Sequence, residues 1–202
     1  MPEYVGEKIR SIPEFRVKYK DIYHMRNLYV MLHEYLLEEG FLDTKGDHEE
    51  IEKLYMEKMV QKGLHRGGKE MWIWWRLLKK PEGKYSGYFL NHLDIDFHMM
   101  YTQDTEIVHQ GKKLKVQMGE IDMLFRPWIE ADWQGKWKDH WLLKHFKHLY
   151  NERIMVAELD KREKELWRES YRVQGQVKKF LDMRQFMPVP EPFTPALYGH
   201  EG

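Results

Sequence analysis

Apolar and polar residues alternate along the middle of the chain with the period of two that is typical of β-strands. Between residues 88 and 101, Leu93, Ile95, Phe97 and Met99 fall on one side of the expected strand. Sequential strands of this kind, joined by short turns, predict an antiparallel sheet that is covered on one side and occupies mainly residues 53–132. The other strands are expected at 15–19, 71–77, 106–109, 113–118 and 120–125.

A spacing of three and four residues between apolar side chains predicts an amphipathic helix over residues 22–39. Asp21 stands where an N-cap is expected, because its carboxylate can accept hydrogen bonds from the first free backbone N–H groups. Gly40 follows the last apolar position and can adopt the left-handed conformation that ends many helices. The pattern therefore predicts one helix before the main sheet.

Residues 47–62 carry two conflicting patterns. Asp47 and Glu50 have the spacing of a capping box, which favours a helix. The later apolar positions also suit a strand that would lead into a glycine-rich hairpin turn at residues 63–68. We favour a strand from residue 53 onward, because a hairpin partner is the simplest neighbour for the strand that follows.

The region 138–184 contains no proline and one glycine, Gly175, and its apolar residues recur at roughly helical spacing. A continuous helix of this length would span ~70 Å, whereas a compact domain of this size is only ~35–40 Å across. The helix is therefore expected to kink, to break near residues 151–160, or to project from the domain. Its highly charged part, residues 158–169, is expected to be exposed or to self-associate.

These elements predict the α+β class, with an antiparallel β-meander sheet packed against helices and one very long C-terminal helix at about 138–184. Residues 1–185 are expected to form a single domain. Residues 186–202 are rich in proline and favour an extended conformation. This tail would lie along the domain as a strap or, alternatively, dock on a partner through Phe193 and Tyr198.

The charges balance, with 33 basic and 33 acidic residues, so no global field would attract nucleic acid. The absence of cysteine excludes disulfides, thiolate zinc sites and cysteine nucleophiles. The first residues lack the apolar segment of a secretory signal. The chain also contains no run of ~18 uncharged apolar residues, the length needed to span a membrane. We therefore expect a cytoplasmic protein with no strong nucleic-acid signal and no membrane span.

The most specific candidate site is the motif His92-x-Asp94-x-Asp96-x-His98, whose four side chains share one face of a strand. Imidazole and carboxylate groups could bind a divalent metal or transfer protons. In such a site His92 and His98 would be the metal ligands, and a later strand would add carboxylates. The candidate catalytic residues are Asp94, Asp96, Glu120 and Asp122.

An exposed sheet face shows the same alternation of charged and apolar residues, and we favour this interpretation. The aspartates of the motif would then pair across strands with Lys113 or Lys115. On this interpretation, replacement of His92 and His98 by alanine would have little effect on folding.

Residues 62–69 form a glycine-rich, basic segment. The segment lacks the order of glycine, lysine and serine or threonine that defines a phosphate-binding loop. A hairpin loop is therefore the interpretation that we favour. The alternative is contact of an anion with the backbone amides, Arg66 and Lys69.

Tryptophan and tyrosine are abundant, with 8 and 12 residues. A core built from large residues accounts for many of them, although each buried indole or phenol also needs a polar partner. Because aromatic residues fall on both faces of the strand at 71–77, either the sheet is covered on both sides or one face exposes a binding surface for something apolar or for a second copy. The candidate interaction residues are Trp72, Trp74 and Trp128, with Phe193 and Tyr198 of the tail.

Three short segments stand out within residues 67–182: GGKEMWIWWR at 67–76, LDIDFH at 93–98 and QGKK at 110–113. Through them this region resembles a set of small archaeal α+β proteins without assigned function. The resemblance implies an archaeal or archaeal-virus origin and a cytoplasmic protein. It implies no particular activity.

The pattern as a whole favours a non-enzymatic interaction or assembly module, a homo-oligomer that self-associates through the long helix and aromatic surfaces. One alternative is a carrier that holds an apolar small ligand in a cavity between sheet and helix. The other is a metal-dependent enzyme that uses the strand face with histidines and aspartates, with a divalent metal as cofactor. The first two functions need no cofactor.

Overall fold

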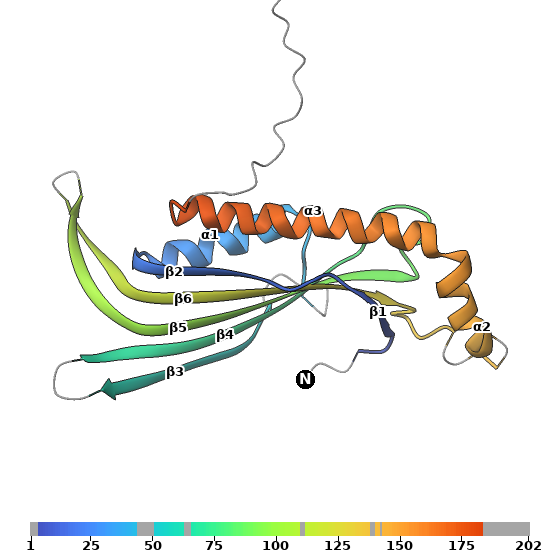
Figure 1. The fold of residues 1–202 in the computed structure, drawn as a ribbon, viewed down its shortest axis with the longest axis horizontal. Coiled ribbons are helices and arrows are strands. Elements are labelled where there is room, and N and C mark those ends of the chain that lie inside the picture. The colour runs from blue at the N-terminus through green and yellow to red at the C-terminus, as the bar shows by residue number, and fades with distance from the viewer. Residues whose placement is uncertain are drawn as a thin grey trace, which may run out of the picture.

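The computed structural model describes residues 4–43, 51–62, 66–109, 112–137, 140–141 and 143–183. These residues form a six-stranded antiparallel sheet with helices α1 and α3 on one of its faces (Figure 1), which confirms the α+β class. The strands are β1 (Glu7–Ser11), β2 (Phe15–Tyr23), β3 (Glu52–Lys62), β4 (Arg66–Lys79), β5 (Phe89–His109) and β6 (Lys112–Ala131). The helices are α1 (Met25–Glu38), α2 (Leu143–Leu149), the π-helical turn η1 (Tyr150–Ile154) and α3 (Val156–Phe180).

Strands β3 to β6 pair consecutively, as expected for a meander, and β6 then pairs with both N-terminal strands. Strand β1 lies against residues 128–131 of β6, and β2 lies against residues 117–125. Pro13 lies between β1 and β2. Because proline has no backbone N–H, it cannot donate a hydrogen bond to a neighbouring strand. This edge of the sheet therefore consists of two short strands, β1 and β2. The strand expected at 15–19 is part of β2.

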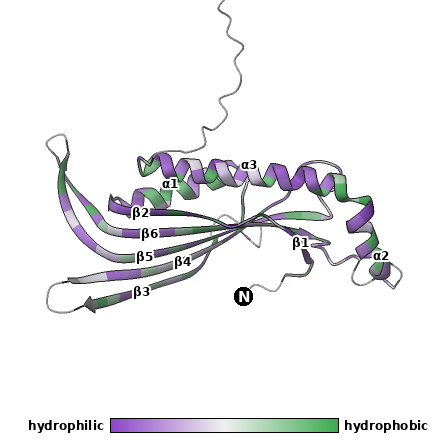
Figure 2. Cartoon of the chain, viewed as in Figure 1, coloured by the Kyte–Doolittle hydropathy of each residue, from purple (hydrophilic) through white to green (hydrophobic). Residues whose placement is uncertain are grey.

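Both helices lie on the side toward which the β5–β6 hairpin curves (Figure 1). The buried residues of each helix recur mostly at intervals of three and four residues, which places them on one face. Hydrophobic and hydrophilic residues alternate along the strands and along α3 (Figure 2). The fully buried core includes Leu28, Leu32 and Leu36 of α1, Leu166, Val173 and Val177 of α3, and Ile73, Trp75, Leu93, Ile95 and Phe97 of the sheet.

Helix α1 begins three residues later than expected. The predicted N-cap, Asp21, lies in β2 opposite Gly119, because the alternating pattern continues to Tyr23. His24 caps the helix instead, since its Nδ1 accepts a hydrogen bond of 3.2 Å from the backbone N–H of Asn27. The end of α1 agrees with the sequence, because Gly40 has a φ of 81°.

The long C-terminal helix divides near the place expected from its length. Helix α2 passes into η1, where the N–H of Met155 donates to the carbonyl of Tyr150 at 2.9 Å, and α3 follows. The charged stretch 158–169 lies in α3, where Leu159, Arg162 and Leu166 are buried. This stretch therefore packs on the domain along one side and does not project from it.

Strand β3 confirms that residues 52–62 are extended. The expected turn at 63–68 is too long, because β4 begins at Arg66 and both Gly67 and Gly68 pair with β3. Gln110 and Gly111, and residues 184–202 with Phe193 and Tyr198, lie outside the described residues.

Strand β5 is continuous over 21 residues, although the sequence predicts two strands in its place. Its register with β6 shifts between Met100 and Gln103, and Tyr101 in between has a φ of 55°. Glycines of both neighbouring strands face this bulge: an added Cβ would lie 2.8 Å from the Tyr101 backbone at Gly68 and 3.0 Å from Met100 O at Gly119. The bulge therefore requires glycine on either side.

Replacement of Gly68 by alanine should lower the free energy of unfolding by about 1–3 kcal/mol, because the new methyl group overlaps the Tyr101 backbone. Gly67→Ala is the matched control, since its Cβ would meet its nearest neighbour at 3.8 Å. Urea denaturation of both variants gives the measurement. Equal stability of the two variants would show that the bulge tolerates a side chain.

Candidate functional site

The outer face of the sheet, opposite α1 and α3, carries the histidine and aspartate motif of β5. Leu93, Ile95, Phe97 and Met99 are fully buried on the other side, so His92, Asp94, Asp96 and His98 share the outer face as the sequence predicts. The structure divides these four residues between three different environments.

His92 lies in a buried pair and not on an exposed face. Its Nε2 is 2.6 Å from Oε2 of Glu130, and the two residues are 2% and 3% exposed. Trp128 stacks on the imidazole with 3.8 Å between ring centroids, and Tyr4 packs edge-on against both rings. The backbone N–H of Gly6 donates to the other Glu130 oxygen at 2.7 Å. The N-terminal segment therefore covers this end of the face, and the expectation of an exposed His92 is wrong.

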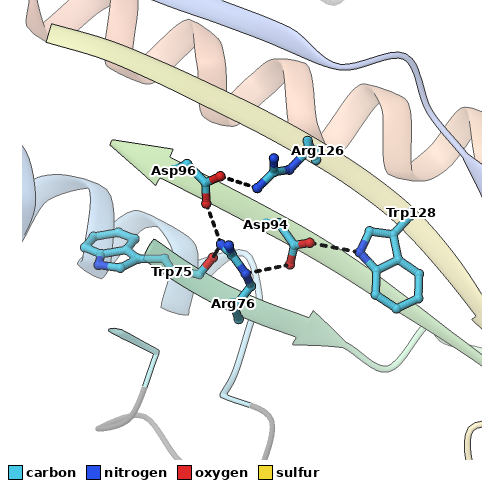
Figure 3. Close-up of polar contacts among 6 residues, drawn as sticks. All are labelled: Trp75, Arg76, Asp94, Asp96, Arg126 and Trp128. Carbon is cyan, nitrogen blue, oxygen red and sulfur yellow. Dashed lines mark hydrogen bonds and ion pairs between the residues drawn. The ribbon is translucent and has the colours of Figure 1, made fainter. Parts of the chain in front are cut away.

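The two aspartates belong to a row of alternating charges that crosses three strands (Figure 3). Arg76 of β4 donates from Nη1 to Asp96 at 2.6 Å, and its Nε lies 3.8 Å from Asp94. Arg126 of β6 binds the second oxygen of Asp96, and the indole N–H of Trp128 donates to Asp94 at 3.2 Å. Both carboxylates are therefore engaged by groups of the neighbouring strands.

Asp94 is the member of this row whose burial is least compensated by neighbouring charges and hydrogen bonds. Burial raises the pKa of its carboxyl, against the opposing effects of Arg76 and of the Trp128 hydrogen bond. Its Oδ1 has no hydrogen-bond partner among the described residues. Asp94 lines an open hollow of about 310 Å³ with Tyr4 and Lys8. Burial, followed by the charge of Asp94, raises the pKa of Tyr4 to about 12.

The remaining members of the predicted site lie farther along the same face. His98 Nε2 is 2.8 Å from Glu70, and its ring stacks on Trp72. Asp122 lies opposite His98 in the register and binds Arg16 at 3.5 Å and Lys18 at 3.3 Å. Glu120 lies opposite Met100 on β5 and Lys20 on β2.

The cross-strand partners predicted for the aspartates are wrong. Lys113 and Lys115 lie opposite Val108 and Glu106, so the partners are Arg76 and Arg126. Counting along the sequence does not identify Arg126. In a hairpin, residues at equal distance from the turn pair with one another, and counting back from the pair His109–Lys112 would place Asp94 opposite Pro127. The register shift between Met100 and Gln103 brings Arg126 opposite Asp94 instead.

The candidate metal ligands do not converge. Among the residues that the structure describes, no group of three or more His, Asp or Glu side chains could hold a metal ion. The Nε2 atom of His92 is hydrogen-bonded to Glu130, and that of His98 is hydrogen-bonded to Glu70. The contacts on this face are therefore those of a structural network of paired charges.

An apolar surface adjoins this network at the β3–β4 end of the outer face. It consists of two neighbouring rows, in which Leu54 lies beside Trp74 and Met56 lies beside Trp72. Trp74 is 40% exposed and Met56 is 47% exposed, and the Arg76 guanidinium lies 5.5 Å from the Trp74 ring. We refer to Leu54, Met56, Trp72 and Trp74 as the aromatic patch.

The other predicted interaction and anion residues lie elsewhere. Trp128 is only 4% exposed beneath Tyr4 and contributes to the lining of the hollow beside Asp94. Lys69 lies 3.2 Å from the Glu57 carboxylate, which balances its charge. The backbone of Arg66 begins β4, and its side chain lies outside the described part of the chain.

No protein-family model, curated protein or solved structure matches this chain. The resemblance to small archaeal proteins therefore stays a prediction. Within the described residues, none of the helices combines the length and the apolar character needed to cross a membrane.

We expect His92→Ala to lower the free energy of unfolding by about 3 kcal/mol, because it leaves the Glu130 carboxylate buried without its partner. His98→Ala is the matched control on the same strand face, where both partners are partly exposed, and should cost less than about 1 kcal/mol. Chemical denaturation measures both values. Losses of the same size would contradict the difference in burial.

Asp94 should make stability depend on pH. Because its pKa is raised in the folded state, its favourable contribution is complete below the unfolded value of 3.8 and is lost as the pH rises through the folded pKa. The stability of the wild-type protein relative to Asp94→Asn should therefore fall from acidic to neutral pH. Urea denaturation at several pH values tests this, with the exposed Glu106→Gln as control. A constant or rising difference would contradict the expected direction.

Proposed function

We propose that this protein is a non-enzymatic interaction module that associates with itself through the β3–β4 end of its sheet. The observation that carries this proposal is the aromatic patch, which lies on β4 and on the edge strand β3 and exposes Met56 and Trp74. Exposed tryptophan and methionine side chains that adjoin one another are typical of protein contact surfaces and are uncommon on an isolated surface.

The composition of the patch supports a contact role. Tryptophan and arginine contribute most to binding energy at protein interfaces, and Trp74 has the Arg76 guanidinium 5.5 Å from its ring. Trp72 is held in place by its stack on His98, with 5.1 Å between ring centroids. A rigid aromatic side chain loses little conformational entropy when a partner covers it.

The long helix is less suited to this role than the sequence suggests. The apolar side chains Leu159, Leu166, Val173 and Val177 of α3 are buried within the domain. Trp167, at 42% exposed, is an aromatic side chain that the helix still presents to solvent. We therefore assign the assembly contact to the sheet and keep α3 as the cover of the core.

Most polar groups of the outer face are arranged for structure and not for catalysis; Asp94, whose Oδ1 lacks a partner among the described residues beside an open hollow, is the exception. A general acid or base needs a free position where a substrate can reach it. Here the imidazole of His92 and the carboxylates of Asp96 and Glu130 are engaged by protein groups, and His92 and Glu130 are also buried. These pairs are suited to holding strands in register.

A second candidate function, the carrier of an apolar small ligand, is favoured by a groove between α1 and the sheet. The groove has a volume of about 330 Å³, near the lower limit for small-molecule sites. It is open to solvent and its lining includes Met25, Tyr29, Tyr55, Met71 and Ile73. We rank this function second, because the groove holds few polar groups that would orient a ligand.

The assembly function predicts that Trp74→Ala shifts the protein toward the monomer, with at least about a tenfold weaker self-association for the loss of an interface tryptophan. The matched control is Trp167→Ala, which removes an equally exposed tryptophan from α3. Sedimentation equilibrium and native mass spectrometry give the masses.

Loss of association in Trp167→Ala alone would assign assembly to the long helix. A wild-type protein that stays monomeric at every concentration would overturn the proposed function. A monomer that carries an apolar small-molecule adduct would favour the carrier.

A further inference from the structure

Strand β3 forms one edge of the sheet in the part of the chain that the structure describes, where it pairs with β4 alone. Along such an edge, alternate backbone N–H and C=O groups point outward and can bind another strand. The edge is 11 residues long, and Tyr55, Met56 and Met59 are 52%, 47% and 66% exposed. It therefore has the length and the exposed side chains needed for the addition of a strand.

The charges along β3 complement themselves when the strand is reversed. Residues 52–58 read Glu-Lys-Leu-Tyr-Met-Glu-Lys. Antiparallel pairing about Tyr55 would place Lys53 opposite Glu57 of a second copy, and Glu57 opposite the Lys53 of that copy. Leu54 would lie opposite Met56 on both sides of the axis. Opposite charges and apolar pairs directly across two strands are favourable contacts.

Other registers lose this complementarity. A two-fold axis perpendicular to the sheet keeps paired residues on the same face. The axis must therefore pass midway between the two copies of one residue. An axis at Met56 would place Leu54 opposite Lys58 and Tyr55 opposite Glu57. An axis at Glu57 would bring two carboxylates together. The charge pattern therefore selects Tyr55 as the centre.

The same register would join the aromatic patches of two copies. Trp74 lies beside Leu54, and Trp72 lies beside Met56, in the pairing of β4 with β3. Because Leu54 would face Met56 of the other copy, each row of the patch would continue across the axis into a row of its neighbour. The two patches would then form one apolar surface over four strands, which links the patch to the edge.

We infer that the partner of this module is a second copy of the same chain, paired through β3 in antiparallel register with Tyr55 on the two-fold axis. This inference rests on the proposed assembly function and specifies its partner and geometry. The axis places the helices of both copies on the same face of a continuous sheet. It also brings the two grooves that Tyr55 lines next to each other.

The contacts within one copy leave room for this pairing. Lys53 Nζ lies 2.6 Å from Asp43, and the Glu57 carboxylate lies 3.2 Å from Lys69. An ammonium group has three donors and a carboxylate has about four acceptor positions, so each can bind a second partner. The side chains of Lys53 and Glu57 would therefore bridge their own sheet to the added strand.

Cysteine cross-linking tests the register directly, because the chain contains no cysteine and each variant has a single thiol. Residues directly opposite in antiparallel strands have Cα atoms about 4.5–5.5 Å apart, within the roughly 4.4–6.8 Å of disulfides. Mild oxidation of the full-length Tyr55→Cys protein should therefore yield a covalent dimer, seen by non-reducing electrophoresis. Tyr55 is half exposed, so folding should tolerate the change.

Met59→Cys is the matched control, because Met59 is exposed on the same strand, four residues from the axis. The two copies of residue 59 would be about 27 Å apart, so this variant should cross-link at least about tenfold more slowly. Equal cross-linking at both positions would indicate random collision and would overturn the register.

The failure of this inference can be told apart from the failure of the assembly function. If Tyr55→Cys forms no covalent dimer while the wild-type protein associates through Trp74, another pairing geometry is in use and the assembly function stands. If the wild-type protein is monomeric in the same sedimentation experiment, both are overturned.

Discussion

The pairing of β5 with β6 is the constraint on which the rest of the structure depends. These strands of 21 and 20 residues determine which side chains face the helices and which face outward. A slip of one residue would move Ile95 and Phe97 from the core to the outer face. Both N-terminal strands pair with β6, so the same hairpin also positions the segment that buries His92 and Glu130.

The sequence predicts the features that follow from local periodicity. It does not predict features that depend on contacts between residues far apart in the chain. Alternation identifies the outward position of the β5 motif, and the length of the C-terminal helix predicts its break. The burial of His92 depends on Tyr4 and Gly6, which no local pattern connects to β5. The sequence predicts the wrong cap for α1, because a strand pattern and a helix pattern overlap around Asp21 and the pairing of β2 with β6 extends the strand to Tyr23.

The outer face combines two surfaces with different physical roles. In the charged half, Asp94 lies directly between Arg76 and Arg126 in the register of three strands. Partly buried ion pairs add little net stability, because desolvation offsets the Coulombic attraction. They disfavour a slip of β4 in one direction, which would place Arg76 opposite His92, whereas a slip by two residues in the other direction would keep Arg76 opposite an aspartate, Asp96. The charged half thus links neighbouring strands, and the aromatic patch leaves Trp74 and Met56 exposed to solvent.

The two edges of the sheet explain why the proposed pairing would stop at two copies. The edge formed by β1 and β2 is interrupted around Pro13, and Arg10 beside it lies within 4 Å of Asp160 and Glu163 of α3. Strand β3 is the longest uninterrupted edge strand among the described residues, and its lysine and glutamate residues disfavour pairing with most strands. A strand that matches those charges is the exception, and the reversed β3 is such a strand. Because a two-fold contact uses β3 of both copies, no equivalent edge is left for a third.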